Sequence, residues 1–147
     1  MKIYLDMDGV VADLKWTMDM SVGHWAALEK LPWATQLVRM CTKYSDEGLA
    51  FLTAGMDGRC YDGKEIWAKK HFPNVPVIYA KRKGALASHN TVLVDDLQHN
   101  LSAFELAGGW GIHMPKFWGK RVTPYFVTSL VERQLKTIRR TMYASSK

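Results

Sequence analysis

The sequence predicts an α/β protein with a parallel sheet of about five strands and helices on both faces. Short apolar runs that favour strands alternate along the chain with longer segments of helical spacing, which is the order expected of a parallel sheet. Polar and acidic residues follow several of the strand-like runs. The chain has 147 residues, 48% of them hydrophobic, which suffices for one domain with a buried core, residues 1–147.

Turn and capping residues set the bounds of the expected elements. Pro32 and Pro124 suit the first position of a helix, which needs no amide hydrogen, and Asp62 can cap a helix. Gly48 and Gly108 can end helices. The expected strands are residues 3–5, 49–53, 75–79, 91–96 and 110–114. The expected helices are residues 22–29, 32–47, 62–72, 85–88 and 100–107, and a last one from 123 onward in which Phe126, Leu130, Gln134, Ile138 and Met142 recur at steps of four.

Composition and charge exclude some classes of protein. Neither a bilayer-spanning apolar run nor a signal-peptide pattern occurs, so we expect no membrane partner and a cytoplasmic location. The net charge is +6, and residues 115–147 hold eight Lys or Arg and one acid, which leaves residues 1–114 at −1. This basic C-terminal helical segment suits an anionic substrate or nucleic acid, or it is a solvated helix face. Cys41 and Cys60 lack metal-type or redox-type spacing and are expected to be reduced thiols.

Two carboxylates follow the first expected strand. Asp6 and Asp8 lie two residues apart after residues 3–5, and Gly9 lets the chain turn and leaves room for a ligand near the backbone. Nearby carboxylates repel each other unless a cation neutralises them, and hard oxygen ligands suit Mg²⁺. A strand that ends in an ordinary Asp-Gly turn explains this pattern equally well, so the choice between a metal site and a plain turn depends on residues later in the chain.

Further polar residues lie at the ends of other expected strands. Thr53 ends the second strand, Asp95 and Asp96 end the fourth, and Lys83 follows the third. In parallel sheets, ligands bind beyond the carboxyl ends of the strands. We therefore expect these side chains to meet the first carboxylate pair at one edge of the sheet.

The expected cluster permits phosphoryl transfer. Asp6 could attack phosphorus as a nucleophile, and Asp8 could protonate the leaving oxygen and then activate water. Mg²⁺ would offset the repulsion between the Asp6 carboxylate and a phosphate dianion.

The remaining residues of the cluster suit the phosphate and the metal. Thr53 and nearby backbone amides, such as that of Ala54, could hold phosphate oxygens. Lys83 could stabilise the charge that these oxygens carry in the transition state. Asp95 or Asp96 would complete the metal shell.

With these residues the chain resembles the haloacid dehalogenase-like (HAD) phosphohydrolases. Four stretches carry the resemblance in the family's order, namely Asp6-Met-Asp8-Gly-Val-Val-Ala-Asp13, Phe51-Leu-Thr53-Ala, Lys83 and Leu93-Val-Asp95-Asp96. They span residues 2–96, and a family-like downstream stretch extends this to about residue 114. Within the superfamily, the first and fourth stretches together look like the 5′(3′)-deoxyribonucleotidase branch and its small phage and bacterial relatives.

The resemblance implies a Rossmann-like core and an aspartyl-phosphate intermediate. It implies that Asp6 is the nucleophile and Asp8 the acid/base. It further implies Mg²⁺ bound by the Asp6 carboxylate, the Asp8 backbone carbonyl and Asp95. Thr53 and Lys83 would then contact the phosphate.

Several neighbours of the site have two interpretations each. Lys81 competes with Lys83 as the phosphate lysine, and we prefer Lys83 because it opens the short helix before the fourth strand, as the family lysine does. Asp96 binds the metal through water or orients Lys83. Asp13 orients the lid or the phosphate loop, or it caps a turn. Asn100 braces the acidic loop or caps its helix.

Residues 14–31 are too short for the helical cap of the deoxyribonucleotidases, so we expect a very small cap and an open site. Such a site leaves room for a larger substrate, such as the phosphorylated end of a nucleic acid. The lid either presents an apolar wall to a base or packs onto the core. The apolar residues concerned are Trp16, Met18, Met20 and Trp25.

The expected function is a Mg²⁺-dependent phosphomonoesterase that hydrolyses nucleotide monophosphates. One alternative is a phosphatase on phosphorylated ends of DNA or RNA, for which the basic segment would contact the backbone. Another is a non-catalytic phosphate-binding module. Arg59 and Lys64 follow Thr53 where they could meet a substrate anion, although a solvated loop is our preferred interpretation. A homodimer is plausible because a neighbouring subunit could complete the short lid.

Overall fold

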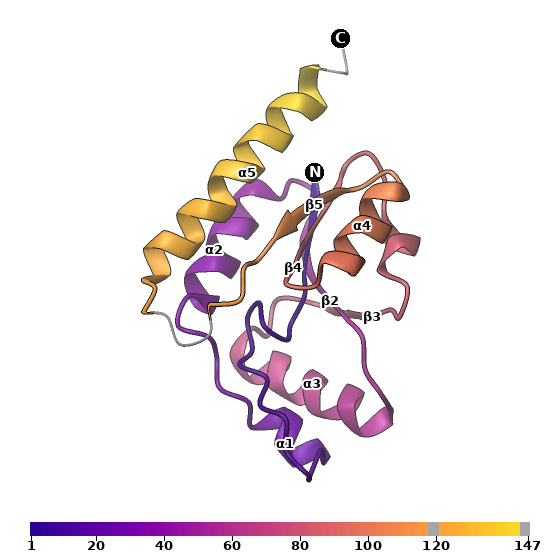
Figure 1. Ribbon diagram of the computed structural model, residues 1–147, viewed down its shortest axis with the longest axis vertical. Coiled ribbons are helices and arrows are strands. Elements are labelled where there is room, and N and C mark those ends of the chain that lie inside the picture. The colour runs from indigo at the N-terminus through magenta and orange to yellow at the C-terminus, as the bar shows by residue number, and fades with distance from the viewer. Residues whose placement is uncertain (118–120, 145–147) are drawn as a thin grey trace.

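Five parallel strands form one sheet in the order β3-β2-β1-β4-β5. The structure is a computed structural model that describes residues 1–117 and 121–144. Its strands are β1 (Lys2–Leu5), β2 (Leu49–Thr53), β3 (Val77–Tyr79), β4 (Thr91–Asp95) and β5 (Trp110–His113). Its helices are α1 (Val22–Ala26), α2 (Ala34–Tyr44), α3 (Gly58–His71), the 3₁₀ helix η1 (Lys83–Leu86), α4 (Gln98–Leu106) and α5 (Pro124–Ala144) (Figure 1). The predicted α/β class is confirmed, and the sheet with its flanking helices is Rossmann-like.

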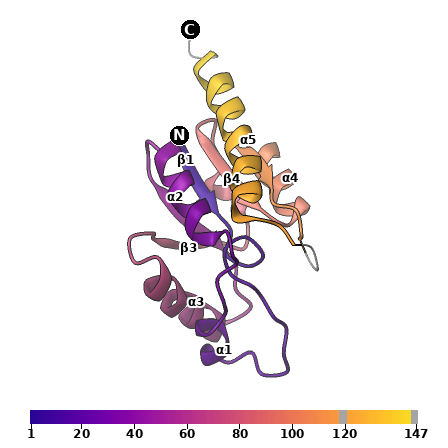
Figure 2. The same cartoon turned by 90° about the vertical axis from the view of Figure 1, so that its left-hand side faces the viewer.

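Both faces of the sheet are buried, and alternate residues of each strand serve different faces. In β1, Ile3 and Leu5 belong to the larger core, whereas Tyr4 belongs to the smaller one. Residues of α2, α3 and α5 pack into the larger core, and α4 with η1 covers the other face. Figures 1 and 2 show α2 and α5 side by side on one side of the sheet and α4 on the other.

Several bounds differ from those predicted by a few residues, and for two of them the structure shows which residue begins the element. Asp57 caps α3, accepting a hydrogen bond from the Cys60 amide, so the prediction that Asp62 caps this helix is wrong. Strand β3 begins at Val77 rather than residue 75, after Pro76. Proline has no amide hydrogen for the ladder, which is why the regular strand begins after it.

The buried face of α5 also differs from the predicted one. The buried series starts one residue later than predicted, at Val127, and the Phe126 side chain is exposed. One residue turns the buried face by about 100° around a helix of 3.6 residues per turn. Of the predicted positions only Ile138 lies in the core. The buried residues of α5 are Val127, Val131, Leu135 and Ile138.

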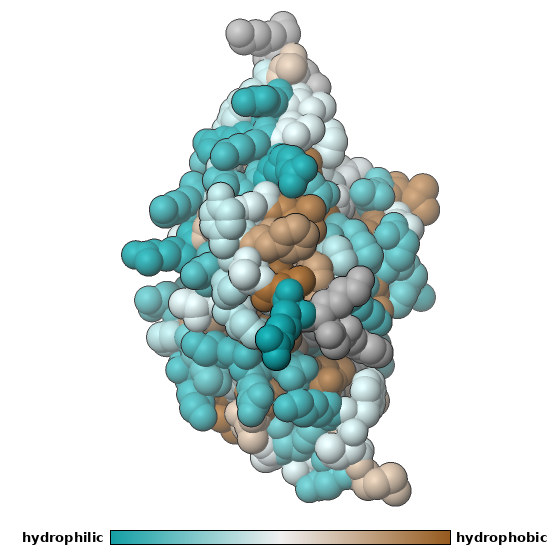
Figure 3. Space-filling model, turned by 60° about the vertical axis from the view of Figure 1, so that its left-hand side comes forward, coloured by the Kyte–Doolittle hydropathy of each residue, from teal (hydrophilic) through white to brown (hydrophobic). Residues whose placement is uncertain are grey.

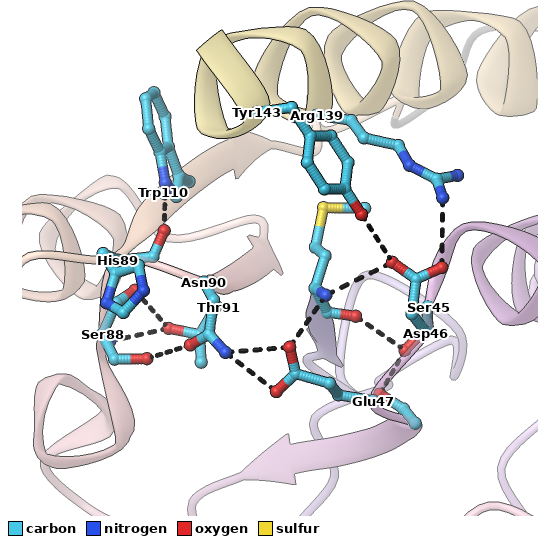
Figure 4. A network of polar contacts seen from close by, with 12 residues as sticks. Ser45, Asp46, Glu47, Ser88, His89, Asn90, Thr91, Trp110, Arg139 and Tyr143 are labelled. Atoms are coloured by element: carbon cyan, nitrogen blue, oxygen red, sulfur yellow. Dashed lines mark hydrogen bonds and ion pairs between the residues drawn. The ribbon is translucent and has the colours of Figure 1, made fainter. Parts of the chain in front are cut away.

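A polar network ties α5 to the edge of the sheet where the strands begin (Figure 4). The Met1 amino group lies 3.4 Å from Asp46 and 3.0 Å from Glu47, and Asp46 also accepts from Arg139 and Tyr143. Part of the charge of the basic C-terminal segment is therefore paired within the fold. Lys120 and Lys147, which also belong to that segment, lie outside the described residues.

On the face drawn in Figure 3, hydrophilic residues cover most of the surface and hydrophobic ones are exposed in a few places. Among residues 1–117 and 121–144, no helix combines the length and the apolar character needed to cross a membrane. Both cysteines are free thiols and are buried, as expected for reduced core residues.

Candidate active site

The polar residues predicted to converge do meet at one edge of the sheet. Strand β1 pairs with β2 on one side and with β4 on the other, so the carboxyl ends of all three lie next to one another. Asp6 directly follows β1, Thr53 ends β2, and Asp95 ends β4. All three side chains are buried. Topology thus brings together residues that are far apart in the sequence.

Lys83 is the residue that links two of these carboxylates. Its Nζ lies 2.6 Å from Asp6 Oδ1 and 2.6 Å from Asp95 Oδ2, and the residue is only 4% exposed. It sits at the first position of η1, whose turn after β3 points it back to the sheet edge. Lys81 is exposed, so the preference for Lys83 over Lys81 agrees with the geometry.

Asp95 is held in place by donors from the loop that follows it. The Leu97 amide donates to Asp95 Oδ1 at 2.8 Å, and Asn100 Nδ2 donates to Asp95 Oδ2 at 3.0 Å. Of its two predicted roles, Asn100 therefore braces the acidic loop. Two oxygens with fixed directions are what a metal ligand or an ion-pair partner needs.

Three carboxylates form a group that could hold a metal ion. One oxygen each from Asp6, Asp95 and Asp96 lies within 4.8 Å of the other two. Gly9 (φ +76°) approaches this group closely, since a β-carbon there would lie 2.6 Å from Asp96 Oδ2. The presence of the Asp96 carboxylate in this group is compatible with a role at the metal, directly or through water, and the choice among its predicted roles stays a prediction. The Asp8 backbone carbonyl remains a predicted ligand.

Burial and mutual repulsion dominate the electrostatics of this group. Burial raises the pKa of Asp6 to about 7, against the opposing effect of Lys83 and with added repulsion from Asp95 and Asp8. Burial, followed by Asp95, also raises the pKa of Asp96. Burial alone would lower the pKa of Lys83, but Asp6 and Asp95 hold it above its ordinary value. A second ammonium, that of Lys116, lies 3.8 Å from Asp96 Oδ2. Three carboxylates beside two ammonium groups still leave an excess of negative charge, which suits a divalent cation.

Lys64 is a second buried lysine that the sequence analysis misjudged. We expected a solvated loop, but Lys64 lies on α3 and is 1% exposed. Its Nζ donates to Asp8 Oδ2 at 2.6 Å, to Thr53 Oγ1 at 2.8 Å and to the Ala54 carbonyl at 2.7 Å. A signal was present in the sequence, because Lys64 falls four residues after Cys60 and three before Trp67, on the apolar stripe of a helix.

A cavity of about 760 Å³ with largely apolar walls lies over the site, and its charged lining includes Asp6, Asp8, Asp96, Lys64 and Lys83. The walls come from the lid, the start of α2 and the loops after β2, β4 and β5. The large apolar residues among them are Leu14, Trp16, Trp25, Leu31, Trp33, Met56, Leu97 and Phe117. The site is thus ionic at its base and apolar around its sides.

No model of a known protein family matches this chain, and neither does any curated protein. The chemistry of the site therefore follows from its own residues, contacts and charges.

The lid residues divide between the two roles considered for them. Trp25 on α1 is buried and Met20 is partly buried against the core, whereas Trp16 is 69% exposed and lines the cavity. Met18 is fully exposed. Helix α1 packs directly on α3 at Gly63. The contact is so close that a β-carbon at Gly63 would overlap the Trp25 side chain and the Val22 carbonyl.

Two other candidates stand apart from the reacting groups. Asp13 lines the cavity, and its carboxylate lies 3.6 Å from Lys15 at the surface. Arg59 is exposed and pairs with Asp57 at 2.7 Å, as the solvated interpretation expected. Neither residue has a direct contact with Asp6, Asp95 or Lys83 among the described residues.

Proposed function

We propose that this protein is a Mg²⁺-dependent phosphomonoesterase that hydrolyses nucleoside monophosphates through a phosphorylated Asp6. The observation that carries the proposal is the buried Asp6 carboxylate, which Lys83 contacts at 2.6 Å and which shares a possible cation site with Asp95 and Asp96. The four stretches that resemble HAD phosphohydrolases support the same proposal, and we infer membership of that superfamily from them.

In the proposed reaction, an oxygen of Asp6 attacks phosphorus and the bond from phosphorus to the leaving oxygen breaks. Lys83 carries three N–H donors and uses two of them on Asp6 and Asp95, so the third can meet a phosphate oxygen. The Thr53 hydroxyl accepts from Lys64 and donates to the Ala54 carbonyl at a long 3.4 Å, a contact that it would exchange for one to a second phosphate oxygen. These donors stabilise the charge that builds up during transfer.

Water then hydrolyses the aspartyl phosphate, and Asp8 serves both halves of the reaction. It gives a proton to the leaving oxygen in the first half and takes one from the attacking water in the second. The Asp6, Asp95 and Asp96 carboxylates would hold Mg²⁺, which offsets the negative charge of the phosphate against that of Asp6.

The cavity supports a nucleotide as the substrate. A phosphate at its charged base would leave the rest of the ester among apolar and aromatic walls, which suit a nucleobase. Pairing of Arg139 with Asp46 and of Lys136 with Glu132 reduces the charge that the basic segment can offer to a polynucleotide. A mononucleotide is therefore our first choice, and a phosphorylated DNA or RNA end our second.

Phosphate release from a panel of 5′- and 3′-nucleotides and 3′-phosphorylated oligonucleotides tests the proposal, with Mg²⁺ and with EDTA. We expect Mg²⁺-dependent release from mononucleotides, and a loss of at least about 10⁴-fold in Asp6→Asn. Asp62→Asn, an exposed carboxylate on α3, is the matched control and should keep full activity. Release from oligonucleotides alone would shift the substrate to nucleic-acid ends, and equal activity of Asp6→Asn would refute the mechanism.

A further inference from the structure

The Lys64 ammonium has no hydrogen left for a substrate. A lysine ammonium has three N–H donors, and the three short contacts of Lys64 end on Asp8, Thr53 and Ala54. The indole of Trp25 closes a further side, with its ring centre 5.2 Å from Lys64 Nζ. Lys64 therefore differs from a phosphate-binding lysine, although it lines the same cavity.

The two oxygens of Asp8 are left in different situations. Oδ2 is fixed by Lys64 at 2.6 Å, whereas Oδ1 is buried without a hydrogen-bond partner among the described residues. A carboxylate pinned through one oxygen has a set orientation, and its other oxygen keeps both of its lone pairs open. An unpaired buried acceptor is costly, so it is a reason to look for a proton or ligand at that atom.

We propose that Lys64 is a positioning residue that fixes Asp8 so that Oδ1 is the atom that carries the proton in catalysis. This inference rests on the proposed function. When Asp6 forms its bond to phosphorus and the ester bond breaks, the leaving oxygen takes the proton from Asp8 Oδ1. In the second half, Oδ1 takes a proton from the water that attacks phosphorus, and the bond to Asp6 breaks to give inorganic phosphate.

The position of Lys64 on a packed helix makes its contacts with Asp8 and Thr53 rigid. It stands on α3, a helix of 14 residues whose neighbouring residue Gly63 packs against the lid helix. The same ammonium holds the loop after β1 through Asp8 and the end of β2 through Thr53. One buried charge thus sets the distance between the acid/base and a phosphate contact, and small displacements of such groups are expensive in rate.

Substrates whose leaving groups differ in basicity can show whether Lys64 positions the proton donor Asp8 or only stabilises the fold. A nucleoside leaves as an alkoxide that needs a proton, whereas 2,4-dinitrophenolate leaves without one. The value of kcat/KM reports the steps up to transfer onto Asp6. We expect Lys64→Met to lose about 10²-fold in kcat/KM on the best nucleotide substrate, and about tenfold less than that on 2,4-dinitrophenyl phosphate, where only the disturbed Thr53 contact matters. Lys70→Met, an exposed lysine on the same helix, should match the wild type on both esters.

Lys64→Arg provides a second variant, because it keeps the charge if removal of the ammonium prevents folding. It should show the same selective loss on the nucleotide, but a smaller one. An equal loss on both esters, or none on either, in a folded variant would overturn the positioning role while leaving the proposed function intact. Failure of the wild type to hydrolyse either ester with Mg²⁺ would instead overturn the proposed function, and this inference with it.

Discussion

The two buried lysines of the site are alike in burial and in the length of their ion pairs, yet their surroundings differ. Lys83 contacts two carboxylates, Asp6 and Asp95, at 2.6 Å each, and keeps one N–H donor. Lys64 contacts one carboxylate and two uncharged oxygens, and keeps none. The same side chain can thus serve as a substrate contact in one half of the site and as a structural clamp in the other.

The charge balance of the two halves differs in the same way. Around Lys83, three carboxylates face its buried ammonium and the more exposed one of Lys116, which lies 3.8 Å from Asp96, and the repulsion among the carboxylates favours a cation. Around Lys64, one carboxylate and one ammonium compensate each other. We therefore assign the metal and the phosphate charge to the Lys83 half, and proton transfer to the Lys64 half.

The largest expected effect is that of replacing Lys83, which we expect to contact the phosphate, in contrast to Lys64. Lys83→Met should lose at least about 10³-fold in kcat/KM on both the nucleotide and 2,4-dinitrophenyl phosphate, because charge on the phosphate oxygens develops whatever the leaving group. Steady-state assays of both esters measure this. Lys81→Met, exposed and two residues away, is the control and should be unchanged. Selective loss on the nucleotide alone would erase the distinction between the two lysines.

A smaller effect locates the cation. At a Mg²⁺ concentration about 100 times its dissociation constant, binding should stabilise the folded protein by about 2.7 kcal/mol. Thermal unfolding with Mg²⁺, against NaCl of equal ionic strength, would show this as a higher Tm. Asp95→Asn should lose most of the shift, whereas Lys64→Met should retain it. A full shift in Asp95→Asn would place the cation elsewhere.

The smallest effect concerns the metal-free protein. Because the pKa of Asp6 is raised from 3.8 to about 7 on folding, its contribution to stability is complete below pH 3.8 and is lost as the pH rises through 7. Asp6→Asn avoids this loss. In EDTA its free energy of unfolding at pH 8 should exceed that of the wild type by on the order of 1–2 kcal/mol, because loss of the ion pair with Lys83 offsets part of the gain. Its Tm should therefore be higher at pH 8, and the difference should shrink at pH 5. A difference in Tm that does not change with pH would contradict the raised pKa of Asp6.

The sequence predicted the Lys83 half of the site better than the Lys64 half, for a physical reason. Asp6, Thr53, Asp95 and Lys83 follow strands, and the rule that parallel strands end at a common edge places them without knowledge of packing. Lys64 reaches the site from a helix face, and only the way α3 packs on the sheet decides which face points inward. Its place between Cys60 and Trp67 indicated burial. A lysine at an apolar helix position, however, usually buries only its methylene chain and keeps its ammonium group in water.

The fold shows the same division between local and tertiary information. Strand β2 has the predicted bounds because its apolar run lies between clear turns. The bounds of α3 and the buried face of α5 differ, since Asp57 rather than Asp62 caps α3 and the buried series of α5 starts at Val127, one residue later than the predicted series from Phe126. Capping geometry and helix packing are set by neighbours that the local pattern does not contain.

Gly63 and Lys64 are consecutive residues of α3, one against the lid helix and the other inside the site. A variant with a larger lid that still docks on α3 would therefore need a small residue at position 63 for the lid contact and a lysine at position 64 for the contact with Asp8. A Gly-Lys step whose lysine lies eleven residues after the threonine that ends β2 is what we expect in any protein that shares both contacts.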